Sequence, residues 1–218
     1  MLFGQYLYQM LELRNIKKHY NKNLALEISF LQLESGIYWV RGTNGSGKTT
    51  LLKMIAALLP FEGDIIFKDI SLKKEPLTYR QNIGWAEAEP LFPSFMTGKD
   101  LLSLYQEIRR VKQKEVNSLL ELFNMTDYVN NAIGTYSTGM VKKLSLVLAF
   151  LGHPPLIVLD EPLITLDADA FNLACNFIEE KNKSTGTTFL ISSHQDLDIE
   201  LSLLGKEITV SNQTVAVE

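Results

Sequence analysis

Residues 42–49 read GTNGSGKT, which matches the pattern G-x-x-x-x-G-K-[ST] of a phosphate-binding loop. A continuous apolar run, Ile37–Val40, precedes the loop, as expected for a strand that is covered on both faces. Apolar residues at helical spacing follow from Thr49 to Leu59, and Pro60 ends the pattern. A strand, a glycine-rich loop and a helix in direct succession predict a βα unit and the start of a parallel sheet.

The residue types in this loop suit phosphate binding. Its glycines let the backbone turn and direct N–H groups at phosphates, Lys48 reaches the β and γ phosphates, and Thr49 offers a hydroxyl to Mg²⁺. We expect one continuous nucleotide-binding segment made of Gly42, Thr43, Asn44, Gly45, Ser46, Gly47, Lys48, Thr49 and Thr50.

A second apolar run, Leu156–Leu159, ends in the carboxylates of Asp160 and Glu161. An acidic pair at the end of a strand is commonly a solvated turn or a helix cap. The phosphate-binding loop upstream favours a catalytic pair instead. We expect Asp160 to hold Mg²⁺ through water and Glu161 to polarise the attacking water.

The rest of the chain has the pattern of an α/β protein. Alternation of apolar and polar residues predicts a half-buried antiparallel layer that places Leu24, Leu26, Ile28 and Phe30 on one side. A capping box at Thr97–Asp100 starts a mainly helical region that continues to about residue 151. The remaining predicted elements are strands at 11–13, 65–67, 83–85 and 187–191, a helix at about 169–182, and a hairpin at 206–217 around Ser211 and Asn212.

Composition limits the class of protein. The chain has 218 residues, of which 46% are hydrophobic, and a formal net charge of −4, so we expect one globular domain and no nucleic-acid partner. The only cysteine, Cys175, cannot form a disulfide within the chain, and neither a secretory signal nor a run of about 18 apolar residues is present. We therefore expect a cytoplasmic location.

Five motifs resemble, in their order and spacing, those of an ABC-type ATPase, the nucleotide-binding subunit of an ABC transporter. They are VRGTNGSGKTTLL (40–52), YSTGM (136–140), LIVLDEP (156–162), TLD (165–167) and ISSH (191–194). The resemblance covers nearly the whole chain from about Leu11. It implies an α/β P-loop NTPase with a parallel core sheet, flanking helices and an antiparallel β layer. Within a single domain, 1–218, the core and β layer would span about 11–88 and 151–218, and an inserted helical subdomain about 89–150.

The resemblance also implies roles for residues outside the loop. Tyr20 would stack on the adenine. Ser137 and Gly139, at the N-terminus of a helix, would close over the ATP of the other subunit in a head-to-tail dimer, with Asp167 at the same interface. His194 would contact the γ phosphate. The implied catalytic residues are then Lys48, Glu161 and His194, and the implied cofactors are ATP and Mg²⁺.

By the same resemblance, the chain would hydrolyse ATP to ADP and phosphate. It would pair with a second copy or a homologous ATPase subunit and drive a separately encoded membrane subunit from the inner face of the membrane. Two alternatives stay open: a nucleotide-gated module that does not hydrolyse ATP, and an ATPase of the cluster-assembly type. The sequence does not identify the transported substrate or the direction of transport.

Three positions depart from the family pattern. Thr138 stands in place of a glycine, and Leu163 stands in place of a threonine, a change that we interpret as packing. The family's metal-contacting glutamine is absent, and counting places its position at either Glu87 or Ala88. Because a carboxylate can serve Mg²⁺ and alanine cannot, we expect Glu87 to join Thr49 and Asp160 at the metal.

The segment that follows, 90–96, is unusually apolar for a connection. It has two possible uses: packing inside the helical subdomain, or a groove for a helix of the membrane subunit.

Overall fold

The computed structural model describes residues 11–193 and 205–217. Four strands near the N-terminus form an antiparallel sheet with the order β2-β1-β4-β5. Long strands with alternating burial form its main ladder, in which Leu11 pairs with Leu33 and Leu13 with Leu31. The strands are β1 (Leu11–Tyr20), β2 (Asn23–Leu33), β4 (Glu62–Phe67) and β5 (Ile70–Ser71).

The antiparallel layer differs from the predicted alternation at one point. Leu26 and Ile28 are buried, but Phe30 is 58% exposed and Leu31 is buried in its place. Asn15, beside this point in β1, has a left-handed backbone with φ 52, which asparagine tolerates better than most residues. The face that meets the core changes there, so the prediction that placed Phe30 beside Ile28 is wrong.

A second, six-stranded sheet has the order β10-β9-β3-β8-β7-β6 and is parallel except where β10 meets β9. β3 and β7 are buried along almost their whole length, as their continuous apolar runs predict. Its strands are β3 (Ile37–Arg41), β6 (Ile83–Ala86), β7 (Leu156–Leu159), β8 (Thr188–Ser192), β9 (Lys206–Ser211) and β10 (Thr214–Val217). The parallel core sheet and the closing hairpin are therefore confirmed.

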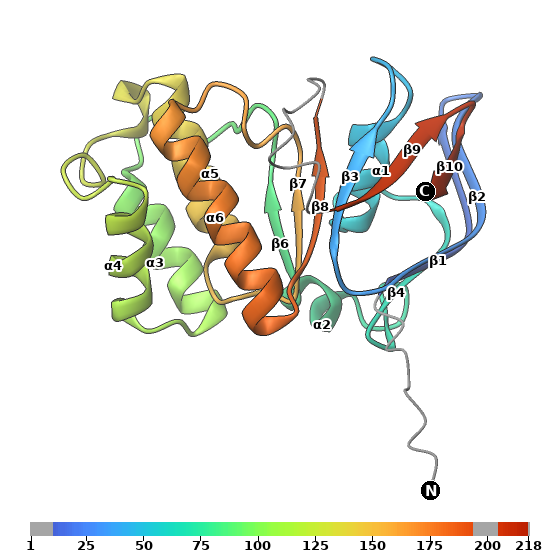
Figure 1. Ribbon diagram of the computed structural model, residues 1–218, viewed down its shortest axis with the longest axis horizontal. Coiled ribbons are helices and arrows are strands. Elements are labelled where there is room, and N and C mark those ends of the chain that lie inside the picture. The colour runs from blue at the N-terminus through green and yellow to red at the C-terminus, as the bar shows by residue number, and fades with distance from the viewer. Residues whose placement is uncertain (1–10, 194–204, 218) are drawn as a thin grey trace, which may run out of the picture.

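Helices cover both faces of this sheet. α5 and α6 lie against one face with α3 and α4 beyond them, while α1 lies between the other face and the antiparallel layer (Figure 1). Buried residues accordingly form two cores, one on each side of the sheet. The helices are α1 (Lys48–Ile55), α2 (Pro76–Gln81), α3 (Gly98–Arg109), α4 (Gln113–Leu122), a short 3-10 turn (Ile133–Thr135), α5 (Thr138–Phe150) and α6 (Ala168–Thr185).

Several element ends differ from the predictions. α1 stops at Ile55 and not near Leu59, because Ala57 takes a left-handed conformation with φ 59 that a helix cannot continue. The capping box is confirmed: the Thr97 side chain accepts from the Asp100 N–H, and the Asp100 carboxylate accepts from the Thr97 N–H. The short elements α2 and β5 were not predicted.

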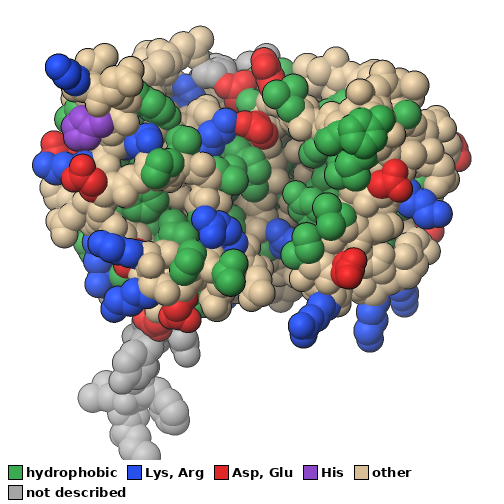
Figure 2. Space-filling view, turned by 180° about the vertical axis from the view of Figure 1, so that it is seen from behind, with side chains coloured by type: hydrophobic (Ala, Val, Ile, Leu, Met, Phe, Trp, Pro, Cys, Tyr) green, Lys and Arg blue, Asp and Glu red, His purple; other side chains and the backbone are tan. Residues whose placement is uncertain are grey.

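Seen from behind, the molecule is hollowed between its helical half and its β half, and hydrophobic side chains gather on both sides of the hollow (Figure 2). The apolar segment 90–96 is partly buried and partly exposed, so packing inside the helical subdomain accounts for only some of its side chains. Phe92 and Met96 pack against the core, whereas Leu91 is 93% exposed and Phe95 is 83% exposed. No helix within residues 11–193 and 205–217 combines the length and apolar character that crossing a bilayer requires.

Candidate functional site

The phosphate-binding loop joins the end of β3 to the start of α1. Two glycines permit its shape. A Cβ at Gly42 would lie 2.4 Å from the Val210 carbonyl oxygen, and Gly47 has φ 110 immediately before α1 begins at Lys48. The loop therefore leaves backbone N–H groups at a helix N-terminus, which attracts anions.

Lys48 lies over this loop and is only 5% exposed. Its Nζ donates to the carbonyl oxygens of Gly42 (2.7 Å) and Thr43 (3.2 Å). Burial lowers the pKa of Lys48, while the carboxylates of Glu161 and Asp160 act in the opposite direction. The ammonium group is thus placed between the loop and the two carboxylates at the end of β7.

Tyr20 lies at the edge of the same loop. Its hydroxyl shares a 3.3 Å hydrogen bond with Oγ1 of Thr50, and 47% of the residue is exposed. Together with residues 43–47 and the tip of the closing hairpin, 211–213, it lines a shallow hollow. An exposed aromatic ring beside a phosphate loop is in a position to stack on a nucleobase.

The two carboxylates at the end of β7 have different surroundings. Asp160 is 1% exposed, and its Oδ1 accepts a 2.6 Å hydrogen bond from the Ser192 hydroxyl. Its Oδ2 is buried and has no hydrogen-bond partner among the described residues. Glu161 has φ 47, and its backbone N–H donates to the same Ser192 hydroxyl at 2.9 Å.

A buried carboxylate oxygen without a donor suits a hydrated divalent cation, because oxygen is the ligand that Mg²⁺ prefers. Thr49 and Asp160 line one cleft, so the residues present fit the ion. Within the described part of the chain, no group of three or more His, Cys, Asp or Glu side chains gathers that could hold a metal by itself.

This cleft has a volume of about 850 Å³ and joins four segments that are distant in sequence. They are α1 near the phosphate loop, the loop 87–91 after β6, the start of α5, and residues 160–165 after β7. Tertiary structure therefore brings Thr49, Glu87, Asp160 and Glu161 to a single edge of the parallel sheet.

Glu87 lines the cleft, but its carboxylate forms an ion pair with Lys53 of α1. The carbonyl oxygens of Glu87 and Ala88 both accept hydrogen bonds from Lys142 of α5. To bind Mg²⁺, the Glu87 carboxylate would have to break its ion pair with Lys53 or contact both cations. The role of Glu87 at the metal stays a prediction.

α5 begins within the YSTGM motif (136–140), which we call the signature segment. Ser137 is the N-cap residue and accepts a 3.2 Å hydrogen bond from the Met140 N–H. A Cβ at Gly139 would lie 3.1 Å from the Thr165 carbonyl oxygen, so the segment 165–167 passes close by. Asp167 caps α6 and pairs with Lys143 of α5 at 2.9 Å, and this hydrogen bond lowers the pKa of Asp167.

Not every predicted site residue can be placed. His194 lies outside the described residues. Leu163 is 8% exposed and belongs to the core on the helical side, in agreement with its interpretation as a packing residue.

Four polar residues at the site were not predicted: Lys53, Lys142, Lys143 and Ser192. The only sign of Lys142 in the sequence is that this lysine occurs within a largely apolar helix, at a position that the structure shows to be buried. The other three carry no local sign of their partners.

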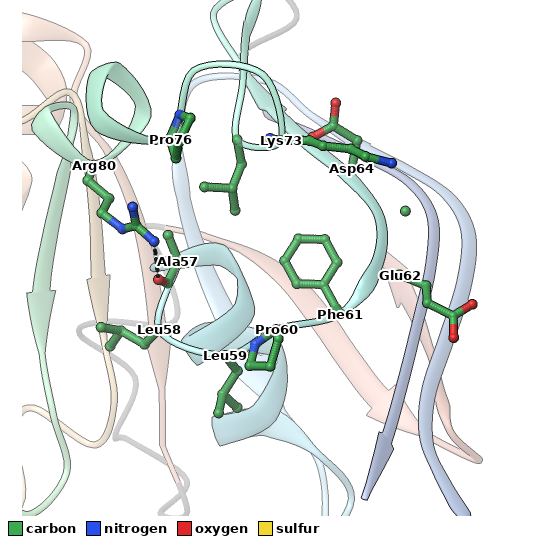
Figure 3. A pocket seen from close by; sticks show the side chains of 12 residues that line it. Ala57, Leu58, Leu59, Pro60, Phe61, Glu62, Asp64, Lys73, Pro76 and Arg80 are labelled. Carbon is green, nitrogen blue, oxygen red and sulfur yellow. Dashed lines mark hydrogen bonds between the residues drawn. The ribbon is translucent and has the colours of Figure 1, made fainter.

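A second hollow of about 690 Å³ lies at the C-terminal end of α1. The Phe61 ring points into it, Glu62 points away from it, and Arg80 donates to the Ala57 carbonyl oxygen (Figure 3). None of the predicted site residues lines this hollow.

Comparison with known proteins adds a family relationship. A family model described as ABC transporter matches residues 26–164. The chain is 36% identical over 199 residues to the ABC transporter ATP-binding protein YtrB of Bacillus subtilis (strain 168), across 88% of this chain and 65% of YtrB. It spans 63% to 65% of the length of three bacterial relatives, so those proteins contain further residues.

Two solved structures have the same fold. One is described as the ATP binding subunit of an ABC transporter. It has a TM-score of 0.86 and 26% sequence identity, and the match covers 96% of this chain and 89% of the other chain. The other is a dimeric post-hydrolysis state of the ATP-binding cassette MJ0796 bound to ADP and Pi. It has a TM-score of 0.80 and 22% sequence identity, and the match covers 96% of this chain and 98% of the MJ0796 chain.

Proposed function

Since the chain belongs to the ABC transporter family, as an ATP-binding protein, we propose that it hydrolyses ATP to ADP and phosphate and thereby powers transport through a separate membrane subunit. The observation that carries this proposal is the buried Asp160 carboxylate, whose Oδ2 has no partner among the described residues. It stands beside Glu161 and shares a cleft with Thr49 of the phosphate loop.

The chemistry assigned to this chain starts with Lys48. Its ammonium exchanges the carbonyl oxygens of Gly42 and Thr43 for the β and γ phosphate oxygens, where it stabilises the charge of the transition state. Glu161 orients a water molecule in line with the γ phosphate and accepts its proton. Thr49 and, through water, Asp160 would hold Mg²⁺, which would supply positive charge against the phosphate oxygens.

We further propose that the active form is a head-to-tail dimer. Ser137 and Thr138 are exposed at the start of α5, where helix N–H groups are available to a phosphate outside this chain. A second copy or a homologous ATPase subunit would supply that phosphate. In this proposal the helical subdomain, about 89–150, brings Ser137 and Gly139 to the partner's nucleotide, with Asp167 at the same interface. His194 is assigned to the γ phosphate.

We assign the contact with the membrane subunit to the apolar segment 90–96, which follows β6. Leu91, which lines the cleft, and Phe95 are both exposed, and burial of two large apolar side chains favours association with a helix of a membrane subunit. The chain would then work at the inner face of the membrane, without nucleic acid.

Phosphate release in the presence of Mg²⁺, measured beside equilibrium binding of a fluorescent ATP analogue, tests the proposed function. Wild type should bind and turn over. Lys48→Ala should lose most of its affinity because the phosphate clamp is removed, and Glu161→Gln should bind but release no phosphate.

Each contrary outcome has a distinct meaning. Binding without turnover in the wild type would identify a nucleotide-gated module. Equal affinity in Lys48→Ala and wild type would refute the assignment of the phosphate loop.

A further inference from the structure

Lys142 is a buried lysine on α5 that is 2% exposed and lines the catalytic cleft. We propose that Lys142 is a positioning residue of the ATPase site, which holds the loop at Glu87–Ala88 in place beside Asp160 and Glu161. This inference rests on the proposed function, but its first consequence, a loop held by one side chain, can be measured without ATP hydrolysis.

The contacts are made to the backbone of the loop. Nζ of Lys142 donates to the carbonyl oxygens of Ala88 (2.6 Å) and Glu87 (3.1 Å). These residues directly follow Ala86, the last residue of β6, whose carbonyl oxygen accepts from the Asp160 N–H at 2.9 Å. The loop that Lys142 holds therefore starts one hydrogen bond away from the catalytic carboxylates.

A second cation holds the same loop from the other side. Lys53 of α1 pairs with the Glu87 carboxylate. α1 begins at the phosphate loop and α5 begins at the signature segment. The loop is thus tied to both helices whose N-termini are assigned to phosphate, so a shift of α5 relative to the sheet would be transmitted to it.

The charge of Lys142 also acts on the reacting groups. Burial lowers its pKa, while the carboxylates of Asp160, Glu161, Glu89 and Glu87 act in the opposite direction. Loss of the amine would leave two carbonyl oxygens without their donor and remove a positive charge near Asp160 and Glu161. Because Lys142 donates to the loop at Glu87 and Ala88, whereas Lys48 donates to the phosphate loop itself, we expect loss of Lys142 to slow the chemical step more than it weakens ATP binding.

The test compares Lys142→Met, which keeps the length of the side chain and removes its donors, with Lys142→Gln, which keeps an N–H donor without charge. Lys114→Met, at an exposed position on α4, is the matched control. Hydrogen–deuterium exchange of a peptide covering residues 86–92 is measured without nucleotide. ATP affinity, kcat and KM are measured with Mg²⁺.

We expect faster exchange in Lys142→Met, an affinity and KM within about threefold of wild type, and a kcat lower by about tenfold or more. Lys142→Gln should restore part of the protection and part of kcat. Lys114→Met should match wild type in every measurement.

Unchanged exchange in Lys142→Met overturns the proposal, as does faster exchange with an unchanged kcat. A parallel loss of affinity, kcat and thermal stability would assign Lys142 a purely structural role and also overturn it. If Lys142→Met does not fold, Lys142→Gln decides by the same criteria. If wild type itself releases no phosphate, the proposed function fails and the catalytic role of Lys142 falls with it, whereas faster exchange would still identify Lys142 as the residue that holds the loop.

Discussion

The hydroxyl of Ser192 joins the carboxylate of Asp160 to the backbone of Glu161: it donates to Oδ1 of Asp160 at 2.6 Å and accepts from the Glu161 N–H at 2.9 Å. β8, which ends at Ser192, lies beside β7, and Leu159 pairs with Ile191. The position of Asp160 and Glu161 therefore depends on the neighbouring strand β8 as well as on β7.

Ser192→Ala tests this dependence. The change leaves a buried carboxylate oxygen and a backbone N–H without their partner, so we expect the free energy of unfolding to fall by about 1–3 kcal/mol. Turnover should fall more than ATP affinity, because Glu161 loses its anchor. Urea unfolding and phosphate release measure the two effects, and Ser118→Ala, an exposed hydroxyl on α4, is the control. Equal stability of the two variants would contradict the prediction.

Glu161→Gln with ATP should form a dimer, because in the proposed head-to-tail arrangement each chain would supply only half of each composite site and uncleaved ATP would hold the halves together. Protein without nucleotide should be largely monomeric. Light scattering distinguishes these states. The double variant Lys48→Ala/Glu161→Gln should stay monomeric in ATP, and a strictly monomeric Glu161→Gln at high protein and ATP would count against composite sites.

Glu87→Ala should raise the Mg²⁺ concentration needed for half-maximal turnover, because a hard oxygen ligand is lost. Ala88→Gln, the neighbouring control, should change little. Lys53→Met separates the two roles of Glu87, since it removes the ion pair and keeps the carboxylate. If Lys53→Met and Glu87→Ala slow turnover equally and Mg²⁺ dependence stays as in wild type, Glu87 acts only through its ion pair.

The ion pair between Asp167 and Lys143 should make a pH-dependent contribution to the free energy of unfolding. Lys143 holds the pKa of Asp167 below its ordinary value of 3.8, so the ionised form is favoured in the folded state. The stabilisation is present above pH 3.8 and disappears as the pH falls through the lower, folded pKa. Asp167→Asn keeps an N-cap side chain but loses the charge. Because Asp167 is largely exposed, the loss should stay below about 1 kcal/mol at neutral pH.

Thermal unfolding of Asp167→Asn measures this effect when it is followed from neutral pH down to below the folded pKa of Asp167, where the wild-type carboxyl is protonated in both the folded and the unfolded protein. The difference from wild type should close at the acid end. In the double variant Asp167→Asn/Lys143→Met the two losses should not add, because both remove the same ion pair. A constant difference across the pH range would exclude the ion pair as its cause.

Much of the fold was predictable because its signals are local. An apolar run of strand length, a glycine-rich loop and helical spacing identify β3, the phosphate loop and α1 within about twenty residues of sequence. The capping box at Thr97 and the hairpin turn at Ser211 and Asn212 are equally local. The local sequence gives no sign of the left-handed backbone at Asn15 and Ala57. The predictions for Phe30 and for the end of α1, which depend on these two residues, were therefore wrong.

The sequence by itself determined the residue types of the site and the order of its motifs, because phosphate and metal chemistry require particular side chains at particular spacings. Only the tertiary structure decided which partners those side chains meet. Lys142 and Ala88 are 54 positions apart in the sequence, and Ser192 and Asp160 are 32 apart. Neither the charge of these residues nor the local hydrophobic periodicity indicates that they pair. These partners follow from the order of the parallel strands, since β6, β7 and β8 end at the same edge of one sheet and bring their loops together there.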